Sequence, residues 1–228
     1  QILKFGGAAV QDAEHIRNVA QIITQYAEEP YMVVVSAMGK TTNALEAILA
    51  DYWYQRGGQA NLEALKSSHH GVVKELTGDQ SLLYEELENL WMDLEFYLDN
   101  APEYPYNYAY DQVVSFGELA ATKILSRYLQ QTIPNKWLDA RNLVLTTDHH
   151  RSAEVRWAET LQAIQRRLKP LLERMPVISQ GFIGATPQGI TTTLGREGSD
   201  YSASIFAYAL KADQVTVWKD VPGILNAD

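Results

Sequence analysis

Short apolar, β-branched runs alternate along the chain with longer segments in which apolar residues recur at helical spacing. The first run, residues 1–5, predicts a strand, and residues 12–26 predict a helix in which Asp12 is a suitable N-cap. The continuous apolar run 31–36 is typical of a strand that is buried on both faces of a parallel sheet. The chain thus begins with a strand, a glycine turn, a helix and a second strand.

The later part of the chain repeats this alternation. Further strands are predicted at residues 137–138, 143–146, 177–179, 190–194 and 214–218, and further helices at residues 111–130, 153–174 and 200–212. Residues 181–189 predict a hairpin-bearing loop. Strands that alternate with helices predict an α/β fold with a mostly parallel sheet and helices on both faces.

A long helical segment interrupts the alternation after the second strand. Residues 42–98 show mostly helical periodicity, broken at Gly57-Gly58 and at Thr77-Gly78-Asp79, which predicts three stacked helices. Residues 100–110, rich in proline and tyrosine, predict a loop before the next helix. We therefore expect a helical subdomain over about residues 42–100, inserted into the sheet domain.

Composition places the chain among ordinary globular proteins and excludes several partners. The 228 residues are 46% hydrophobic and 21% charged, which suits one large domain. A formal net charge of -9 argues against a nucleic-acid or membrane partner, because both need a basic patch. No apolar stretch reaches the roughly 20 residues that span a bilayer. The absence of cysteine excludes disulfides and thiolate metal sites, and it suits the reducing cytoplasm, where we expect a soluble protein.

Four separated stretches carry glycine or acidic residues that folding alone does not demand. They are Lys4-Phe5-Gly6-Gly7, Val35-Ser36-Ala37-Met38-Gly39, Thr193-Leu194-Gly195-Arg196-Glu197-Gly198-Ser199-Asp200 and Trp218-Lys219-Asp220-Val221-Pro222-Gly223. Each follows a predicted strand, and open α/β sheets bind their ligands at the carboxyl ends of strands. Together these stretches indicate a phosphoryl-transfer site.

The first and third of these stretches can bind anions in different ways. Gly6 and Gly7 let backbone N–H groups approach phosphate oxygens beside Lys4, although the segment matches neither the Walker loop nor the dinucleotide fingerprint. In the third stretch, the glycines, Arg196 and the Ser199-Asp200 pair form an anion cradle at a helix start, where Ser199 or Asp200 can be the N-cap. Capping does not account for Arg196, whose planar guanidinium suits a bidentate grip on a substrate carboxylate.

The order of these motifs resembles the kinase domain of the aspartokinases. The resemblance spans the whole chain, and it is carried by the four stretches together with Thr42-Asn43, Ser115-Phe116-Gly117-Glu118 and Gly198-Ser199-Asp200-Tyr201-Ser202-Ala203. It implies an amino acid kinase-like fold, a three-layer αβα sandwich with a mostly parallel central sheet, here with a helical insertion. It also implies a transferase that converts L-aspartate to 4-phospho-L-aspartate with ATP, the step that opens lysine, threonine and methionine biosynthesis.

Carried over by motif, the resemblance implies roles for single residues. Lys4 would bridge the phosphate and the aspartate side-chain carboxylate, and Asp200 would orient Lys4. The residues at the substrate would be Ser36 and Thr42 near the phospho-accepting carboxylate, Glu118 at the amine, and Arg196 at the α-carboxylate.

The nucleotide site that the resemblance implies uses the glycine loop and the last strand. Its residues would be Lys4, Gly6 and Gly7 with their amides on the phosphates, Ser199, Lys219, Asp220 and Gly223. Mg²⁺ would be held mainly through the nucleotide phosphates, without a protein metal site. An aspartate carboxylate with a pKa of about 3.9 is already ionised at neutral pH, so the chemistry needs no general base.

The chain departs from the family pattern at several positions. Ala8-Ala9 replaces the usual Thr-Ser after the glycines, Glu197 stands where glycine is usual, and Lys219 replaces a threonine. The chain ends at Asp228, where the family continues into the rest of its nucleotide pocket and into regulatory ACT domains. We therefore expect one amino acid kinase domain over residues 1–228, truncated at its C-terminus, with weak or no turnover by itself and a homo-oligomer in the full-length protein.

Two other functions fit parts of the pattern. Another member of the superfamily, such as a glutamate or acetylglutamate kinase, shares the glycine loop and the sheet but not the pairing of Ser-Phe-Gly-Glu with Arg-Glu-Gly-Ser-Asp. A catalytically silent binding or regulatory domain of the same fold is favoured by Ala8-Ala9 and by the abrupt end of the chain. Comparison of L-aspartate with L-glutamate as substrate separates the kinases.

Overall fold

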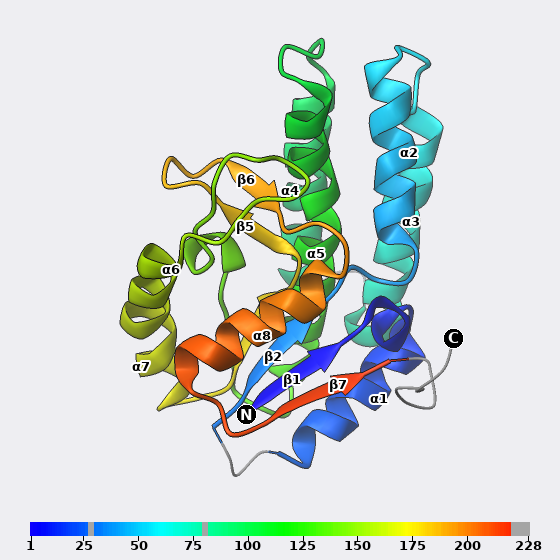
Figure 1. The fold of residues 1–228 in the computed structure, drawn as a ribbon. Helices are drawn as coiled ribbons and strands as arrows, with labels where there is room; N and C mark the ends of the chain where they lie inside the picture. The colour runs from blue at the N-terminus through cyan, green and yellow to red at the C-terminus, as the bar shows by residue number, and fades with distance from the viewer. Residues whose placement is uncertain (27–29, 79–81, 220–228) are drawn as a thin grey trace, which may run out of the picture.

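The structure is a computed structural model that describes residues 1–26, 30–78 and 82–219. Within these residues the central sheet has the strand order β3-β4-β2-β1-β7, and all of its neighbouring strands are parallel. Its strands are β1 (Ile2–Phe5), β2 (Met32–Val35), β3 (Lys136–Trp137), β4 (Val177–Gln180) and β7 (Val215–Trp218). The predicted parallel sheet is confirmed, and the carboxyl ends of its strands share one edge (Figure 1).

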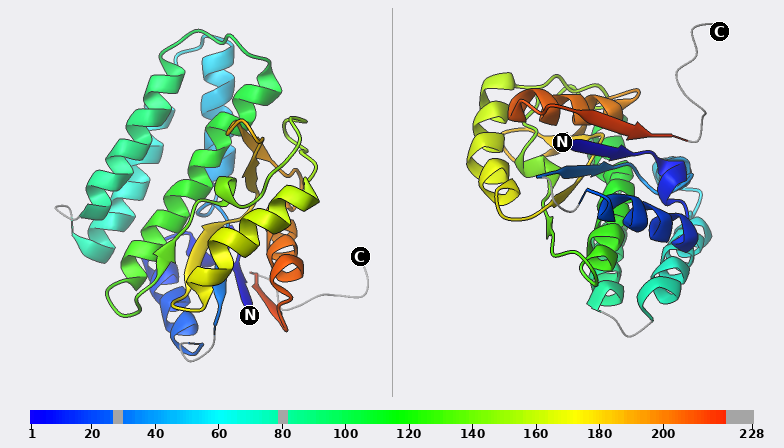
Figure 2. Two further views of the ribbon diagram at one scale, coloured as in Figure 1. Left: turned by 90° about the vertical axis from the view of Figure 1, so that its left-hand side faces the viewer. Right: turned by 90° about the horizontal axis from the view of Figure 1, so that it is seen from below.

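Helices cover both faces of the sheet, because side chains alternate along each strand and both faces are apolar. Leu3 and Val33 pack into one buried cluster, whereas Ile2 and Val34 pack into the other. The helices on the first face include α1 (Ala13–Thr24) and α5 (Tyr106–Leu129), and those on the second are α6 (Trp157–Ala163), a π-helical turn (Ile164–Leu168), α7 (Lys169–Leu172) and α8 (Gly198–Leu210). The described residues therefore form the predicted three-layer αβα arrangement (Figure 2).

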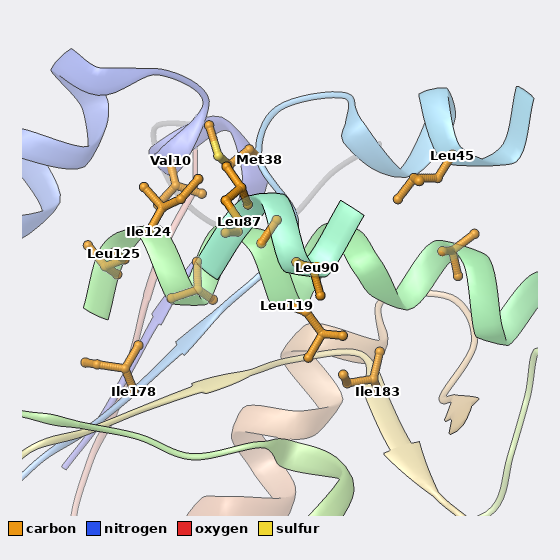
Figure 3. Packing of buried hydrophobic residues seen from close by; sticks show 14 of the residues in the cluster. Val10, Met38, Leu45, Leu87, Leu90, Leu119, Ile124, Leu125, Ile178 and Ile183 are labelled. Atoms are coloured by element: carbon orange, nitrogen blue, oxygen red, sulfur yellow. The ribbon is translucent and has the colours of Figure 1, made fainter. Parts of the chain in front are cut away.

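The predicted helical insertion is a bundle of helices that packs against α5 (Figure 1). Its helices are α2 (Thr41–Trp53), α3 (Gln59–Thr77) and α4 (Leu82–Leu98). Leu87 of α4, Leu119 of α5 and Ile178 of β4 belong to one buried cluster (Figure 3). The bundle thus shares its core with the sheet, so α5 is fixed on both sides.

The predicted hairpin is a separate antiparallel pair, β5 (Ile183–Ala185) and β6 (Thr191–Thr193). Two short 3-10 helices, Gly7–Val10 and Ala140–Asn142, complete the elements within the described residues. None of the described helices is long and apolar enough to cross a bilayer.

Several predicted elements differ in the structure. Residues 143–146 do not form the predicted strand. They make only single bridges, from Leu145 to Ala185 of β5 and from Thr146 to Val155, because they lie beside β5 and not beside a strand of the central sheet. Helix α5 begins at Tyr106, within the predicted loop, since a proline is tolerated at a helix start. The helix predicted from residue 153 begins at Trp157 and contains the π-helical turn just before Pro170, whose nitrogen cannot donate to the helix ladder.

Candidate active site

The described parts of the four stretches singled out in the sequence meet at the carboxyl edge of the central sheet. Gly6 directly follows β1, Ser36 follows β2 and Lys219 follows β7. These strands are neighbours in the sheet, and the third stretch leads from β6 into α8, which packs on β1 and β2. Segments that are far apart in sequence are thereby brought to one place.

Lys4 and Asp200 form an ion pair across this edge. Because side chains alternate along β1, Lys4 shares the face of Ile2, which is the face covered by α8. The Lys4 side chain is 4% exposed, and its Nζ lies 2.5 Å from Oδ1 of Asp200 in the first turn of α8. Nζ of Lys219 lies 2.6 Å from the other oxygen, Oδ2. The structure thus brings together Lys4 and Asp200, the two residues that the resemblance pairs.

The two lysines also decide the charge of Asp200. Burial opposes ionisation of this carboxyl, but hydrogen bonds from Lys219 and Lys4 outweigh it and lower its pKa. Asp200 is therefore a carboxylate at neutral pH with a cation at each oxygen. It is suited to orient Lys4, and it is poorly suited to accept a proton or to bind a metal ion.

The start of α8 is shaped by glycine packing. Glu197 occupies the N-cap position with a φ of 54°, and no side chain caps the helix. This left-handed backbone explains why glycine suits the position. A Cβ on Gly198 would lie 2.7 Å from the Phe182 ring, so the turn packs too closely for a larger residue. The prediction of Ser199 or Asp200 as N-cap is wrong, because both lie inside the first turn.

The glycine loop after β1 offers fewer free amides than predicted. The N–H of Gly6 donates to the carbonyl of Trp218 at 3.1 Å, which extends the pairing of β1 with β7. It is therefore not free for a phosphate, contrary to the expectation for Gly6. No described residue accepts a hydrogen bond from the N–H of Gly7. A Cβ on Gly7 would lie 2.6 Å from the carbonyl oxygen of Ala37, so this position requires glycine.

An open pocket of about 360 Å³ adjoins the start of α8. Its lining includes each of the predicted substrate residues, Ser36, Thr42, Glu118 and Arg196. Oγ of Ser36 donates to Oγ of Ser199 at 2.9 Å, which joins the end of β2 to the helix that carries Asp200. The pocket therefore lies beside the Lys4–Asp200 pair.

Glu118 supplies a buried carboxyl group to the pocket. It is 3% exposed, and burial raises its pKa to about 8, although the N–H of Ala37, 3.3 Å from Oε1, partly offsets this. Oε2 is buried and has no hydrogen-bond partner in the described part of the chain. An unpartnered buried oxygen is costly, so this atom is suited to accept from a cationic ligand group.

The pocket also contains residues that the sequence patterns did not single out, namely Tyr110, Arg151 and Phe182. The guanidinium carbon of Arg151 lies 4.3 Å from the centroid of the Tyr110 ring. The only sequence signal near Arg151 is the polar run that contains His149-His150, which lacks a glycine motif. Its position depends on a contact between distant segments, so local patterns could not reveal it.

The remaining residues predicted at the nucleotide are Lys219, Asp220 and Gly223. Lys219, expected at the nucleotide, is paired with Asp200. Asp220 and Gly223 lie outside the described residues. In the described ranges, no group of three or more His, Asp or Glu side chains is placed to hold a metal ion.

Comparison with known proteins identifies similar sequences along the whole chain. The profile of the amino acid kinase family matches residues 1–228. Lysine-sensitive aspartokinase 3 of Escherichia coli (strain K12) is 34% identical over 228 residues, which are 100% of this chain and 50% of that protein. Aspartokinase 1, chloroplastic, of Arabidopsis thaliana is 35% identical over 241 residues, covering 100% of this chain and 41% of the relative.

A solved structure shows the same arrangement. E. coli aspartokinase III in complex with aspartate and ADP superimposes with a TM-score of 0.90 at 33% identity, over 98% of this chain and 49% of that one. The chain thus spans about half the length of the relatives it matches. The resemblance to aspartokinase catalytic domains that the motifs indicated is confirmed.

Proposed function

The chain belongs to the amino acid kinase family, and on this premise we propose that its protein transfers the γ-phosphoryl group of ATP to the side-chain carboxylate of L-aspartate. The observation that carries the proposal is the ion pair of buried Lys4 with Asp200, beside a pocket lined by the buried carboxyl of Glu118 and by Arg196. The names of the similar proteins, aspartokinases at 34% and 35% identity, support the choice of substrate.

The pocket residues are matched to the functional groups of L-aspartate. The unpartnered Oε2 of Glu118 accepts from the substrate ammonium, and Arg196 binds the α-carboxylate. Ser36 and Thr42 lie at the side-chain carboxylate, because Ser36 is hydrogen bonded to Ser199, next to Asp200. An amine and two carboxylates are thus recognised by groups of opposite charge or by hydroxyl donors.

The nucleotide phosphates bind at the Lys4 end of the site. Lys4, held by Asp200, supplies the buried positive charge. The N–H of Gly7, which has no acceptor among the described residues, and the Ser199 hydroxyl are the nearby donors. Lys219 reaches the same carboxylate from the exposed side and adds a second cation. Asp220 and Gly223 remain predictions for the rest of the nucleotide site.

The reaction is a phosphoryl transfer between two anions. An oxygen of the side-chain carboxylate forms a bond to the γ-phosphorus, the bond from this phosphorus to the β–γ bridging oxygen breaks, and ADP leaves with the electron pair. No proton has to be removed, since the carboxylate is already ionised. The protein therefore acts through positioning and through the charge of Lys4.

The described carboxylates of the site do not suit Mg²⁺, which would therefore be held mainly by the nucleotide phosphates. Both oxygens of Asp200 are engaged by lysines, and Glu118 is a buried group with a raised pKa, so neither suits a hard cation. When bound with the nucleotide, Mg²⁺ would supply positive charge that neutralises the phosphates. The chain's own part is to place Lys4 and the amide of Gly7 around the phosphates.

The surroundings of the complete protein are also inferred. A cytoplasmic location agrees with the absence of cysteine, and a net charge of -9 agrees with small-molecule substrates in place of nucleic acid or membrane. We retain a homo-oligomer as the expectation for the full-length protein.

Initial rates of ADP release by the full-length protein test the proposal. We expect turnover with L-aspartate and little with L-glutamate or N-acetyl-L-glutamate. The N-acetyl compound lacks the ammonium that Glu118 would bind, and L-glutamate is longer by one methylene. A higher rate with L-glutamate would favour another amino acid kinase. Calorimetric binding of L-aspartate without ADP release would favour a silent binding domain.

A further inference from the structure

One cationic residue of the pocket has no part in the proposed function. Arg151 lines the same pocket as Arg196 and comes from the segment between β3 and α6. Both arginines flank Gly195: Arg196 follows it in the chain, and the carbonyl oxygen of Arg151 lies 3.2 Å from the place of a Cβ on Gly195. The backbones of the two arginines therefore lie at the same end of the pocket, beside Gly195.

The backbone of Arg151 is held in a conformation that most residues avoid. Its φ is 71°, in the left-handed region that favours glycine. Fully buried Asp111 holds it there, accepting from the N–H of Arg151 at 3.1 and 3.2 Å. Asp111 also contacts Nδ1 of His150 at 2.6 Å and accepts from Oγ1 of Thr193 at 2.6 Å. Strain fixed this firmly by buried groups is typical of functional sites.

The side chain of Arg151 is positioned but not neutralised. Its guanidinium lies over the ring of Tyr110, whose hydroxyl donates to Oε1 of Glu46 at 2.7 Å. Asp111 contacts only the backbone of Arg151, and among the described residues no carboxylate forms an ion pair with the Arg151 guanidinium. A guanidinium over an aromatic ring can still donate through its edge to a planar carboxylate. In a chain with a net charge of -9, an unpaired arginine in a pocket indicates an anionic ligand group.

We propose that Arg151 is a second carboxylate-binding arginine, which acts with Arg196 on the α-carboxylate and makes the site specific for amino acids whose α-carboxylate is free. The proposal rests on the proposed function. A carboxylate has two oxygens with about four acceptor positions, so it can accept from two guanidinium groups. In the proposed function, Glu118 binds the amine and Lys4 lies at the phosphates. The α-carboxylate would then lie at the end of the pocket where Arg151 and Arg196 flank Gly195.

The test compares Arg151→Gly with the wild type in the full-length protein, using L-aspartate and its α-amide. We expect the KM for L-aspartate to rise about 10- to 100-fold, with kcat and the KM for ATP nearly unchanged. The preference for L-aspartate over the α-amide should fall by the same factor. Since glycine accepts the φ of 71°, the unfolding midpoint should stay or rise.

Two further variants make the outcome specific. Arg174→Gly, at an exposed residue after α7, should leave all these values unchanged. Arg196→Ala should raise the KM for L-aspartate in the same way, and the double variant should lose less than the product of the single effects if both arginines bind one carboxylate.

The alternatives give different results. A lower unfolding midpoint with an unchanged preference over the α-amide would show that Arg151 only supports the loop, and a rise confined to the KM for ATP would place it at the nucleotide. Either result overturns the inference while the proposed function stands. A wild-type protein without L-aspartate turnover would overturn the proposed function, and this inference with it.

Discussion

Among single residues, Lys4 is the group on which the proposed phosphoryl transfer would depend most. We predict that Lys4→Met lowers kcat by about 10²- to 10³-fold, because it removes the buried charge that is proposed to stabilise the transferred phosphoryl group. The fold should persist, since Asp200 keeps its contact with Lys219. Steady-state kinetics and circular dichroism measure the two effects, with exposed Lys169→Met in α7 as the control. A kcat close to that of the wild type would contradict this role.

The raised pKa of Glu118 predicts that the affinity for L-aspartate depends on pH. In the free protein its pKa is raised by burial from 4.5 to about 8, so the carboxyl is largely neutral at pH 7. Binding of an ammonium requires the carboxylate. The affinity for L-aspartate should therefore rise with pH up to about 8, by at most about tenfold per pH unit, with release of a proton on binding.

The variant Glu118→Gln, which cannot ionise, tests whether Glu118 causes the pH dependence of the affinity for L-aspartate. Titration calorimetry with L-aspartate should show a weaker affinity that no longer changes over the same pH range. Because the folded pKa is above the unfolded one, the free energy of unfolding of the wild type should fall between pH 4.5 and about 8, and this contribution should vanish in the variant. A wild-type affinity that is flat over this range would show that Glu118 does not bind the amine.

Sequence patterns identified the residues that follow strands and glycines, such as Lys4 and Arg196. They could not identify Arg151, because its place depends on Asp111, a residue 40 positions away whose burial is decided by tertiary packing. The amide of Gly6, which is hydrogen bonded to Trp218, and the amide of Gly7, which has no acceptor in the described part of the chain, also look alike in the sequence. Only the pairing of β1 with β7 distinguishes them.

At the scale of elements, the crossing of α2 and α5 positions Glu118 and Thr42. A Cβ on Gly117 of α5 would lie 2.9 Å from Cβ of Ala37 and 3.1 Å from Cγ2 of Thr41. We predict that Gly117→Ala lowers the free energy of unfolding by about 1–3 kcal/mol through overpacking, despite the higher helix propensity of alanine.

Gly71→Ala in α3 is the matched control for this prediction. A Cβ on Gly71 would have no neighbour within 4 Å, so alanine should stabilise the protein by about 0.5–1 kcal/mol. Urea unfolding measures both variants. Equal stabilisation by the two substitutions would mean that close packing at Gly117 does not fix the crossing of these helices.

The elements themselves were largely predictable, because the apolar spacing that defines them is local. Predictions were wrong where a tertiary contact determines the structure. Residues 143–146 have the composition of a strand, but they form only single bridges, to Ala185 of β5 and to Val155. The start of α8 was misplaced for a similar reason, since Gly198 fits against Phe182.

At the scale of the whole molecule, a parallel sheet brings the carboxyl ends of β1, β2 and β7 to one edge, and α8 crosses them with Asp200 in its first turn. This arrangement follows from alternating strands and helices, so the sequence could predict where the site lies. The strand order β3-β4-β2-β1-β7 depends on pairing between distant segments, which local patterns do not encode.

In the proposed function, this edge of the sheet positions the side-chain carboxylate of L-aspartate to attack the γ-phosphate of ATP. The most direct measurement is to trap the acyl phosphate with hydroxylamine during turnover by the full-length protein, and to locate the hydroxamate by mass spectrometry. We predict ATP-dependent formation of the side-chain hydroxamate of L-aspartate, lost in Lys4→Met. A hydroxamate at the α-carboxylate, or formation unaffected by Lys4→Met, would contradict the account.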